Sequence, residues 1–227
     1  MAMSYVLARG RTLRPGVYGI DGSELPPFES GRVDPRQWFD DGCRPLEIEI
    51  GAGKGTFLVQ QAPKRPEVNY LGIEKSSDLY RYAADRMRRR RIDNVRILRT
   101  DAAEFVRFWC RGGIARVIHL YFSDPWPKKR HHKRRVIQDQ TMIEIHRVLC
   151  PGGELRLVTD HADLWAWYED HAARHASCFE RRRFVCPEAA GEGEIVGTNF
   201  ERKYRAEGRP FFSMTLVRGG DEVRRTD

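Results

Sequence analysis

The chain has 227 residues, a length typical of one sizeable domain, and its 41% of hydrophobic residues is enough for a packed core. No stretch approaches the roughly 18 apolar residues of a membrane-spanning helix, and residues 1–14 lack the apolar core of a signal peptide. Five scattered cysteines without a CxxC pair are typical of reduced intracellular thiols. We therefore expect a cytoplasmic protein with no metal and no membrane partner.

Basic residues outnumber acidic ones by 40 to 32, which gives a net charge of +8. The excess is concentrated in two segments, one within residues 86–91 and the other in residues 128–135. Two separated basic patches can follow a bent nucleic-acid backbone, which a single charged tail cannot do. The charge distribution therefore favours a nucleic-acid partner.

The chain divides into three parts along its length. Residues 1–44 are rich in Gly, Pro and Arg without a sustained period, so we expect an irregular or partly disordered arm. From residue 46, strands are predicted at 46–50, 69–74, 95–98, 116–122 and 154–159, and helices at 56–62, 77–91, 102–109, 136–149 and 162–176. Residues from 184 to 217 predict two more strands around a loop and a short helical turn. The folded domain thus spans 45–218, and residues 219–227 are expected to be a disordered tail.

This alternation of strands and helices indicates the fold class. Five successive strand–helix units predict an α/β, Rossmann-like fold whose sheet is mostly parallel and has helices on both faces. The final strand pair indicates an antiparallel C-terminal edge, for seven strands in all.

A glycine-rich turn, with Gly51, Gly53 and Gly55, follows the first predicted strand and opens a helix. Glycines at such a turn allow positive φ and let a ligand approach the bare backbone. The dinucleotide pattern G-x-G-x-x-G fails at Thr56, and the Walker pattern is broken by residues 53–55. What remains, E-x-G-x-G-x-G from Glu49, resembles S-adenosylmethionine-dependent methyltransferases. A plain tight turn is the alternative.

Acidic residues at the carboxyl ends of predicted strands strengthen the cofactor interpretation. Open α/β sheets bind ligands beyond those ends, and Glu74 lies about twenty residues after the turn, where an acid accepts from ribose hydroxyls. Asp101 is placed to accept from an adenine amino group, and Glu49 to meet the cationic methionine end of the cofactor. Helix caps or surface acids are the alternative for each residue alone.

The most distinctive segment begins with Asp124, Pro125 and Trp126 and continues into the basic residues 128–135. The prolines stiffen the loop, and a fixed acid at the mouth of a cofactor crevice can read the amino and ring N–H groups of a purine. Trp126 either stacks on a base or anchors the loop. For the basic run we favour phosphate contact over an idle solvated surface.

Two later segments complete the candidate site. Asp160 follows the fifth predicted strand, and Thr198, Asn199, Phe200 and Glu201 stand together further on. The second segment has the pattern of a helix capping box, which is compatible with Glu201 also facing a substrate.

In their order, these motifs resemble bacterial tRNA (guanine-N7-)-methyltransferases, over roughly residues 44 to 218. The resemblance implies a class I methyltransferase fold, S-adenosylmethionine as cofactor, tRNA as partner, and methylation of N7 of a guanosine in the variable loop (position 46). Ser123 departs from the proline that many members carry, so we expect the loop to be less rigid at this position.

The resemblance also implies roles for individual residues. Asp124 and Asp160 would be catalytic. The cofactor side would be formed by Glu49, Gly51, Gly53, Gly55, Glu74, Asp101 and Asp124. The target nucleotide would contact Lys128, Asp160, Thr198, Asn199, Phe200 and Glu201. The rest of the RNA would contact Arg130, His131, His132, Lys133, Arg134 and Arg135.

Two other functions remain open at this point. One is a methyltransferase that acts on a small molecule or a protein, and the other is a non-catalytic RNA-binding module on the same fold. The sequence also leaves open whether the protein is a monomer or a homodimer and which tRNAs it modifies.

Overall fold

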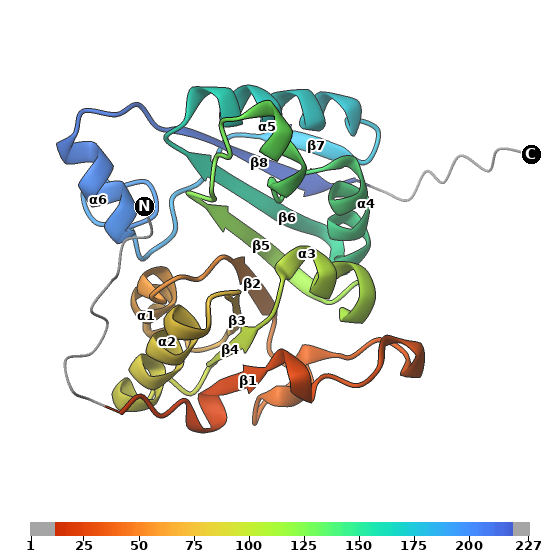
Figure 1. Cartoon of the computed structure of the whole chain (residues 1–227), viewed down its shortest axis with the longest axis vertical. Coiled ribbons are helices and arrows are strands. Elements are labelled where there is room, and N and C mark those ends of the chain that lie inside the picture. The colour runs from red at the N-terminus through yellow and green to blue at the C-terminus, as the bar shows by residue number, and fades with distance from the viewer. Residues whose placement is uncertain (1–11, 220–227) are drawn as a thin grey trace, which may run out of the picture.

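A computed structural model describes residues 12–219 of the chain. Its centre is one sheet with the strand order β1-β4-β3-β2-β5-β6-β8-β7 (Figure 1). Neighbouring strands from β1 to β6 in this order are parallel, and β8 is antiparallel to both β6 and β7. The strands are β1 (Gly19–Asp21), β2 (Leu46–Ile50), β3 (Asn69–Ile73), β4 (Val95–Arg99), β5 (Ala115–Tyr121), β6 (Leu149–Thr159), β7 (Phe179–Arg182) and β8 (Phe212–Arg218).

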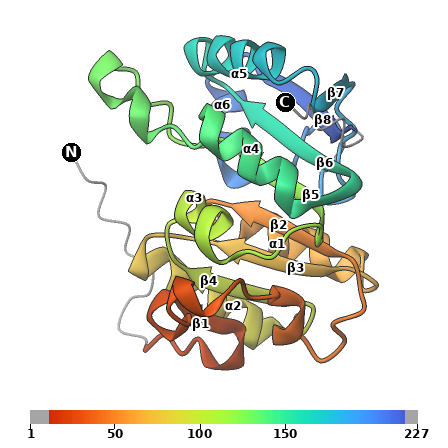
Figure 2. The same ribbon diagram turned by 90° about the vertical axis from the view of Figure 1, so that its right-hand side faces the viewer.

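Helices cover both faces of this sheet, which confirms the predicted fold class (Figures 1 and 2). One apolar core joins the sheet to α3 (Ala102–Glu104), the π-helical turn η6 (Phe105–Trp109), α4 (Asp139–Val148) and α5 (Ala162–Arg174). The core on the other face joins it to α1 (Thr56–Gln61) and α2 (Ser77–Arg90). The remaining helices are α6 (Asn199–Ala206) and the 3-10 helices η1 (Gly16–Tyr18), η2 (Gly22–Glu24), η3 (Phe28–Ser30), η4 (Pro35–Trp38), η5 (Ala62–Lys64) and η7 (Lys129–Arg134).

The central strand β2 is buried along its whole length, and its two faces differ in polarity. Its aliphatic residues belong to the core under α3, α4 and α5, so side-chain alternation turns Glu47 and Glu49 to the opposite face. Glu47 is satisfied there, because its Oε2 lies 2.9 Å from Nε2 of His119 on β5. The other ring nitrogen of His119 lies 2.6 Å from the hydroxyl of Tyr121. This buried network is internal to the fold.

The structure has eight strands where the sequence predicts seven. The additional strand, β1, lies in the segment expected to be irregular and pairs in parallel with β4. Asp21 at its end accepts two hydrogen bonds of 2.6 Å from the guanidinium of Arg99 on β4. A strand of three residues is too short to produce an alternating pattern, so the sequence did not reveal it. The first eleven residues of the arm and residues 220–227 of the expected tail lie outside the described residues.

Two predicted strand boundaries are also shifted. The strand expected from residue 184 is β7, which ends at Arg182, and residues 183–198 form a connection to α6 instead. β6 begins at Leu149 because that residue pairs with Ala115 before a shift in register between the two strands. Pro151 therefore lies inside the first part of β6 rather than in a turn after the helix.

None of the helices within residues 12–219 is long and apolar enough to cross a membrane. In the same part of the chain, no three side chains of His, Cys, Asp or Glu gather in a way that could hold a metal ion. The five cysteines are free thiols.

Candidate active site

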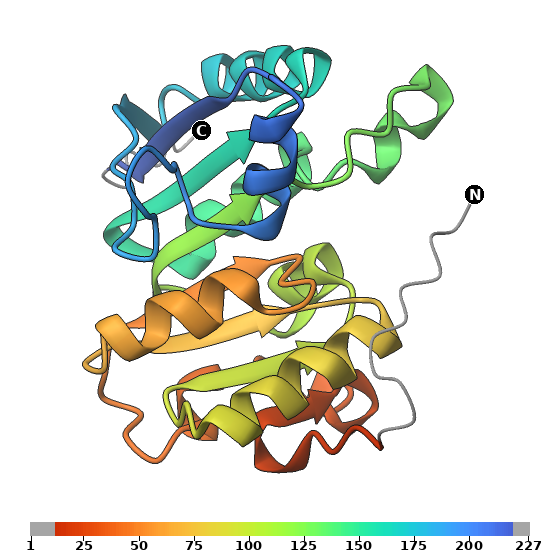
Figure 3. The same ribbon diagram turned by 90° about the vertical axis from the view of Figure 1, so that its left-hand side faces the viewer.

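The parallel strands β2 to β6 end at one edge of the sheet, hereafter the carboxyl edge. An acidic residue lies at or just beyond the end of each: Glu49 on β2, Glu74 after β3, Asp101 after β4, Asp124 after β5 and Asp160 after β6. The arrowheads of these strands point to the side on which η7 projects from the molecule (Figure 3). The structure therefore brings the five acids predicted from the sequence to a common edge.

The glycine turn between β2 and α1 requires glycine for two different reasons. Gly51, Gly53 and Gly55 all have positive φ, at 77°, 55° and 64°. A Cβ on Gly51 would meet nothing within 4 Å, and one on Gly53 would meet only the Gly51 carbonyl oxygen at 3.9 Å. A Cβ on Gly55 would lie 2.7 Å from Cε of Met87 on α2. The first two glycines thus expose bare backbone to open space, whereas Gly55 permits close helix packing.

Glu74 connects the turn to the end of β3. Its Oε2 accepts a 2.8 Å hydrogen bond from the backbone N–H of Gly53, and its Oε1 accepts one of 2.8 Å from the N–H of Ser76. Each carboxylate oxygen has a second lone pair, so both can still accept from a ligand hydroxyl. The position predicted for ribose recognition is therefore held rigidly against the glycine turn.

Glu49 is the least satisfied acid of the group. It is buried, and its Oε2 has no hydrogen-bond partner among the described residues. Burial, with a smaller contribution from the negative charge of Glu74, raises the pKa of Glu49 well above its ordinary range. A buried carboxylate without a partner is costly, and a bound cation is the usual way to offset that cost.

Asp101 serves as the N-cap of α3. Its Oδ1 accepts from the backbone N–H groups of Ala103 at 3.0 Å and Glu104 at 3.2 Å, and its Oδ2 accepts from Nζ of Lys75 at 2.9 Å. Burial alone would raise the pKa of Asp101, but the hydrogen bonds from Lys75 and the helix N-terminus outweigh it and lower that pKa. Asp101 is consequently an ionised, oriented acceptor beside the turn.

The loop after β5 holds two residues in unusual backbone conformations. Phe122 and Trp126 have φ values of 52° and 42°, in the left-handed region that bulky residues rarely adopt. Between them, the hydroxyl of Ser123 lies 2.8 Å from that of Tyr168 on α5. Asp124 is exposed between these fixed points and forms no hydrogen bond or ion pair with a described residue. Such strained conformations at a loop are typical of functional sites.

Residues 128–134 form a cationic loop that projects from the body of the molecule (Figures 2 and 3). Most of its cations are exposed and have no acidic partner within residues 12–219; these are Lys128, Lys129, Arg130 and Lys133. Arg134 is exposed as well, with its guanidinium carbon 4.8 Å from the centre of the Trp126 ring. Trp126 thus supports the loop from within rather than anchoring it in the core.

Three residues expected to contact RNA make contacts within the protein. Arg135 is buried, donates a 2.9 Å hydrogen bond to the carbonyl of Pro125, and pairs with Asp163. His132 packs edge-on against Trp167 of α5, and His131 packs edge-on against Trp126. These contacts give Arg135 and the histidines a role in holding the loop, so Arg135 is not a free cation for phosphate.

The segment before α6 also differs from expectation. Thr198 caps α6 by accepting from the N–H of Glu201 at 3.1 Å, which confirms one half of the predicted capping box; the other half, a hydrogen bond from the N–H of Thr198 to the Glu201 side chain, does not form. Glu201 is fully buried and accepts hydrogen bonds from the backbone N–H groups of Ile195, Val196 and Gly197. With this complement of partners Glu201 organises the preceding turn, and its carboxylate lies inside the protein rather than on its surface.

Asn199 and Phe200 are the members of this segment that remain accessible. Phe200 is 48% exposed, and Asn199 donates a 3.2 Å hydrogen bond to the hydroxyl of Thr56, the first residue of α1. α6 is therefore attached to the helix that begins at the glycine turn.

Two arginines near the acids were not predicted as site residues. Nη1 of Arg209 donates a 2.8 Å hydrogen bond to Asp160, and its guanidinium carbon lies 4.1 Å from the centre of the Tyr204 ring. Nothing in the local sequence indicates this pairing across 49 positions. Nη1 of Arg86 donates to the carbonyl of Lys54 in the glycine turn at 3.1 Å. Arg86 lies three residues after Ala83, which packs in the core, and this helical spacing was the sequence signal for its inward position.

Comparison with known proteins gives consistent matches. A family model described as "Putative methyltransferase" matches residues 43–214. A tRNA (guanine-N(7)-)-methyltransferase of Nitrobacter hamburgensis is 40% identical over 171 residues, covering 73% of this chain and 67% of that protein. The enzyme of the same name from Staphylococcus saprophyticus is 31% identical, covering 88% of this chain and 90% of its own. A SAM-dependent methyltransferase from Aquifex aeolicus is similar in fold, with a TM-score of 0.52 at 11% identity, covering 76% of this chain and 81% of that one.

Substitutions in the glycine turn can distinguish a glycine that lets a ligand approach the backbone from one that allows close helix packing. We expect Gly53→Ala to cost about 1 kcal/mol of stability for its positive φ and to weaken S-adenosylmethionine binding strongly, because the new methyl group enters the open space. Gly55→Ala should cost roughly 2 kcal/mol or more, because strain and the clash with Met87 add. Thermal unfolding and calorimetric titration measure both effects. Unchanged cofactor affinity in Gly53→Ala would contradict the interpretation that a ligand approaches the backbone at Gly53.

Proposed function

Because the chain belongs to the tRNA (guanine-N(7)-)-methyltransferase family, we propose that it transfers a methyl group from S-adenosylmethionine to N7 of guanosine 46 in the variable loop of tRNA. The product would be 7-methylguanosine. The observation that carries this proposal is the juxtaposition along one sheet edge of acids suited to a cationic cofactor and of an unpaired cationic loop suited to RNA.

The residues at the turn fit the expected cofactor. Glu49 would receive the ammonium of its methionine part, which supplies the missing charge partner, and Glu74 would accept from the ribose hydroxyls. Asp101 would accept from the adenine amino group, while the bare backbone at Gly51 and Gly53 leaves room for close approach. S-adenosylmethionine supplies a methyl group bonded to a positively charged sulfur.

The target base makes modest chemical demands on the protein. N7 of guanine has an in-plane lone pair and no proton, so its attack on a methyl group needs no general base. The protein must hold N7 in line with the donor and stabilise the positive charge that guanine acquires. Asp124 and Asp160 would accept from guanine N1–H and the exocyclic amino group, which places N7 and offsets that charge.

Accessible groups around these acids would complete the nucleotide site. Lys128 would contact a phosphate, and Asn199 and Phe200 would contact the nucleotide from α6. Arg209 engages only Oδ2 of Asp160, so Oδ1 can accept from guanine while the ion pair is intact, and opening of the pair would release Oδ2 for a second hydrogen bond. Arg209 would then keep its ion pair with Glu207. The remaining cations of residues 128–134 would bind backbone phosphates.

Transfer of a labelled methyl group tests the function directly. The protein, labelled S-adenosylmethionine and unmodified tRNA should give label in 7-methylguanosine alone, and a tRNA with adenosine at position 46 should accept none. Cofactor binding without transfer to any RNA would support methylation of another substrate, and no cofactor binding would support a non-catalytic RNA-binding module. Either result would refute the proposal.

Asp160 is the sharpest test of the nucleotide site. Asp160→Asn keeps the shape of the side chain but cannot accept two hydrogen bonds from guanine as a carboxylate does, so we expect turnover to fall by roughly 100-fold, about 2.7 kcal/mol. The affinity for S-adenosylmethionine and the thermal midpoint should change little. The exposed residue Asp40 supplies the control Asp40→Asn. Wild-type turnover in Asp160→Asn would remove this residue from the mechanism.

A further inference from the structure

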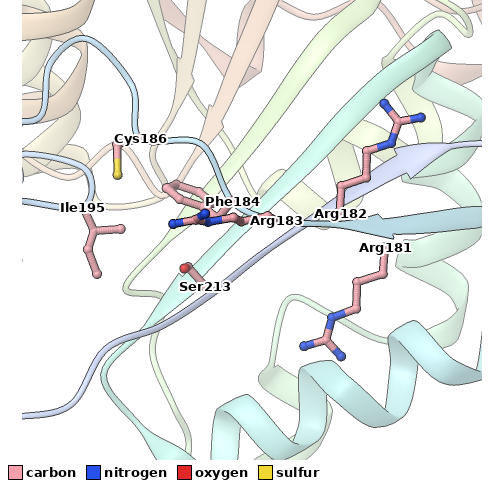
Figure 4. A pocket seen from close by; sticks show the side chains of 7 residues that line it. All are labelled: Arg181, Arg182, Arg183, Phe184, Cys186, Ile195 and Ser213. Atoms are coloured by element: carbon pink, nitrogen blue, oxygen red, sulfur yellow. The ribbon is translucent and has the colours of Figure 1, made fainter.

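Two hollows in the described part of the chain are lined by arginines, and they lie at opposite edges of the sheet. One, of about 500 Å³, is formed by residues 181–184 at the end of β7 together with Cys186, Ile195 and Ser213 (Figure 4). The other, of about 300 Å³, includes Arg90 and Arg91 at the end of α2. Their different positions relative to the five acids make them a natural comparison.

The first hollow, hereafter the β7 hollow, opens at the carboxyl edge. β7 is antiparallel to β8, which is antiparallel to β6, so β7 and β6 end on the same side. Ser213 pairs with Val158, two residues before Asp160. Ile195 on the opposite wall donates its N–H to Glu201, which caps the turn before α6. The hollow thus adjoins both ends of the proposed nucleotide site.

The three arginines of the β7 hollow differ in their pairing. Arg181 extends past β7 towards α5, as Figure 4 shows, and donates to Glu169 at 3.1 Å. Arg182 forms two hydrogen bonds with Glu180, at 2.9 and 2.8 Å. Arg183 is exposed and has no hydrogen bond or ion pair with a residue in the described range. The hollow therefore holds one guanidinium that is available to an anion.

The order of the strands in the sheet indicates which anion Arg183 would meet. The cationic loop follows β5, Asp160 follows β6, and the hollow lies at β8 and β7, so the target nucleotide would sit between two cationic surfaces. Two strand spacings, roughly 10 Å, separate β6 from β7. That span lies within reach of nucleotides next to the target in a single RNA strand.

We propose that the β7 hollow binds a backbone phosphate of the tRNA next to the target guanosine, with Arg183 as the contact. A guanidinium forms two parallel hydrogen bonds with phosphate, and the hydroxyl of Ser213 in the same hollow is a further donor. This proposal rests on the proposed function, since it requires that RNA be the substrate. It gives the RNA strand a path across the carboxyl edge, from the cationic loop past Asp160 to β7.

The opposite hollow provides a matched control. The sequence suggested that the basic segment 86–91 also follows the nucleic acid, but Arg88 and Arg89 pair with Asp85, and Arg90 lies at the end of α2 away from the five acids. α2 ends where the chain turns into β4, so Arg90 lies at the edge of the sheet where the parallel strands begin. Arg90 is likewise exposed, lines a hollow and has no acidic partner within residues 12–219. Arg183→Gln and Arg90→Gln therefore remove the same charge from similar surroundings on opposite edges.

The test measures tRNA binding by the full chain at several salt concentrations. Arg183→Gln should weaken binding roughly fivefold to tenfold and reduce the slope of log affinity against log salt by about one, as the loss of one phosphate contact requires. Arg90→Gln should match the wild type in both. Compared with Arg183→Gln, Arg183→Lys should regain most of the salt slope but a smaller part of the tRNA affinity, because lysine keeps the charge and cannot form the paired hydrogen bonds.

Two readouts keep this result separate from the function itself. Cofactor affinity and turnover at saturating tRNA should be unchanged in Arg183→Gln, because Arg183 does not touch the reacting atoms. If the wild type methylates tRNA and Arg183→Gln binds it with wild-type affinity and slope, the β7 proposal is refuted and the proposed function stands. Equal losses of tRNA affinity in Arg183→Gln and Arg90→Gln would also refute the β7 proposal, because the position of the arginine on the sheet would then make no difference.

Discussion

The arrangement of the site depends on one buried carboxyl group, with an oxygen that has no hydrogen-bond partner among residues 12–219. Glu49 is the penultimate residue of the central strand β2, where it is enclosed by the sheet and the helices on that face. Its neighbour on the same face, Glu47, has His119 as a partner, whereas Glu49 has none in the described part of the chain and lies near a second acid, Glu74. Such a buried acid is suited to a bound cation, which offsets the cost of ionising it, and the exposed backbone of the glycine turn lies beside it.

The other acids differ in how much the protein has already satisfied them. Asp101 and Glu74 accept backbone hydrogen bonds that fix their orientation and leave lone pairs for a ligand. Asp160 is held by an exposed arginine that can exchange for a base, and Asp124 has no partner in the described chain. The acids after β3 and β4 are thus rigid acceptors suited to a small cofactor, whereas those after β5 and β6 are more available to a nucleotide.

The sequence predicted the features that depend on local pattern. Strand ends, the glycine turn and the cap at Thr198 follow from alternation, glycine spacing and a capping box. It did not predict which charged residues are buried, because that depends on contacts between distant segments. Arg135 carries the same charge as its exposed neighbour Arg134, and Glu201 stands between the exposed residues Phe200 and Arg202. Both are internal because Pro125 and the turn at residues 195–197 fold onto them.

Proton release on cofactor binding tests the role of Glu49 most directly. Because burial raises the pKa of Glu49, this side chain stays protonated at pH values above the ordinary pKa of glutamic acid. A bound ammonium group favours the ionised carboxylate, so cofactor binding should release a proton. The cofactor affinity should therefore increase as the pH rises towards the raised pKa. Calorimetric titration of S-adenosylmethionine in buffers of different ionisation enthalpy counts that proton. At pH values between the ordinary and the raised pKa of Glu49, we predict that cofactor binding releases about one proton from the wild type and none from Glu49→Gln. No release by the wild type, or equal release by both proteins, would contradict the account.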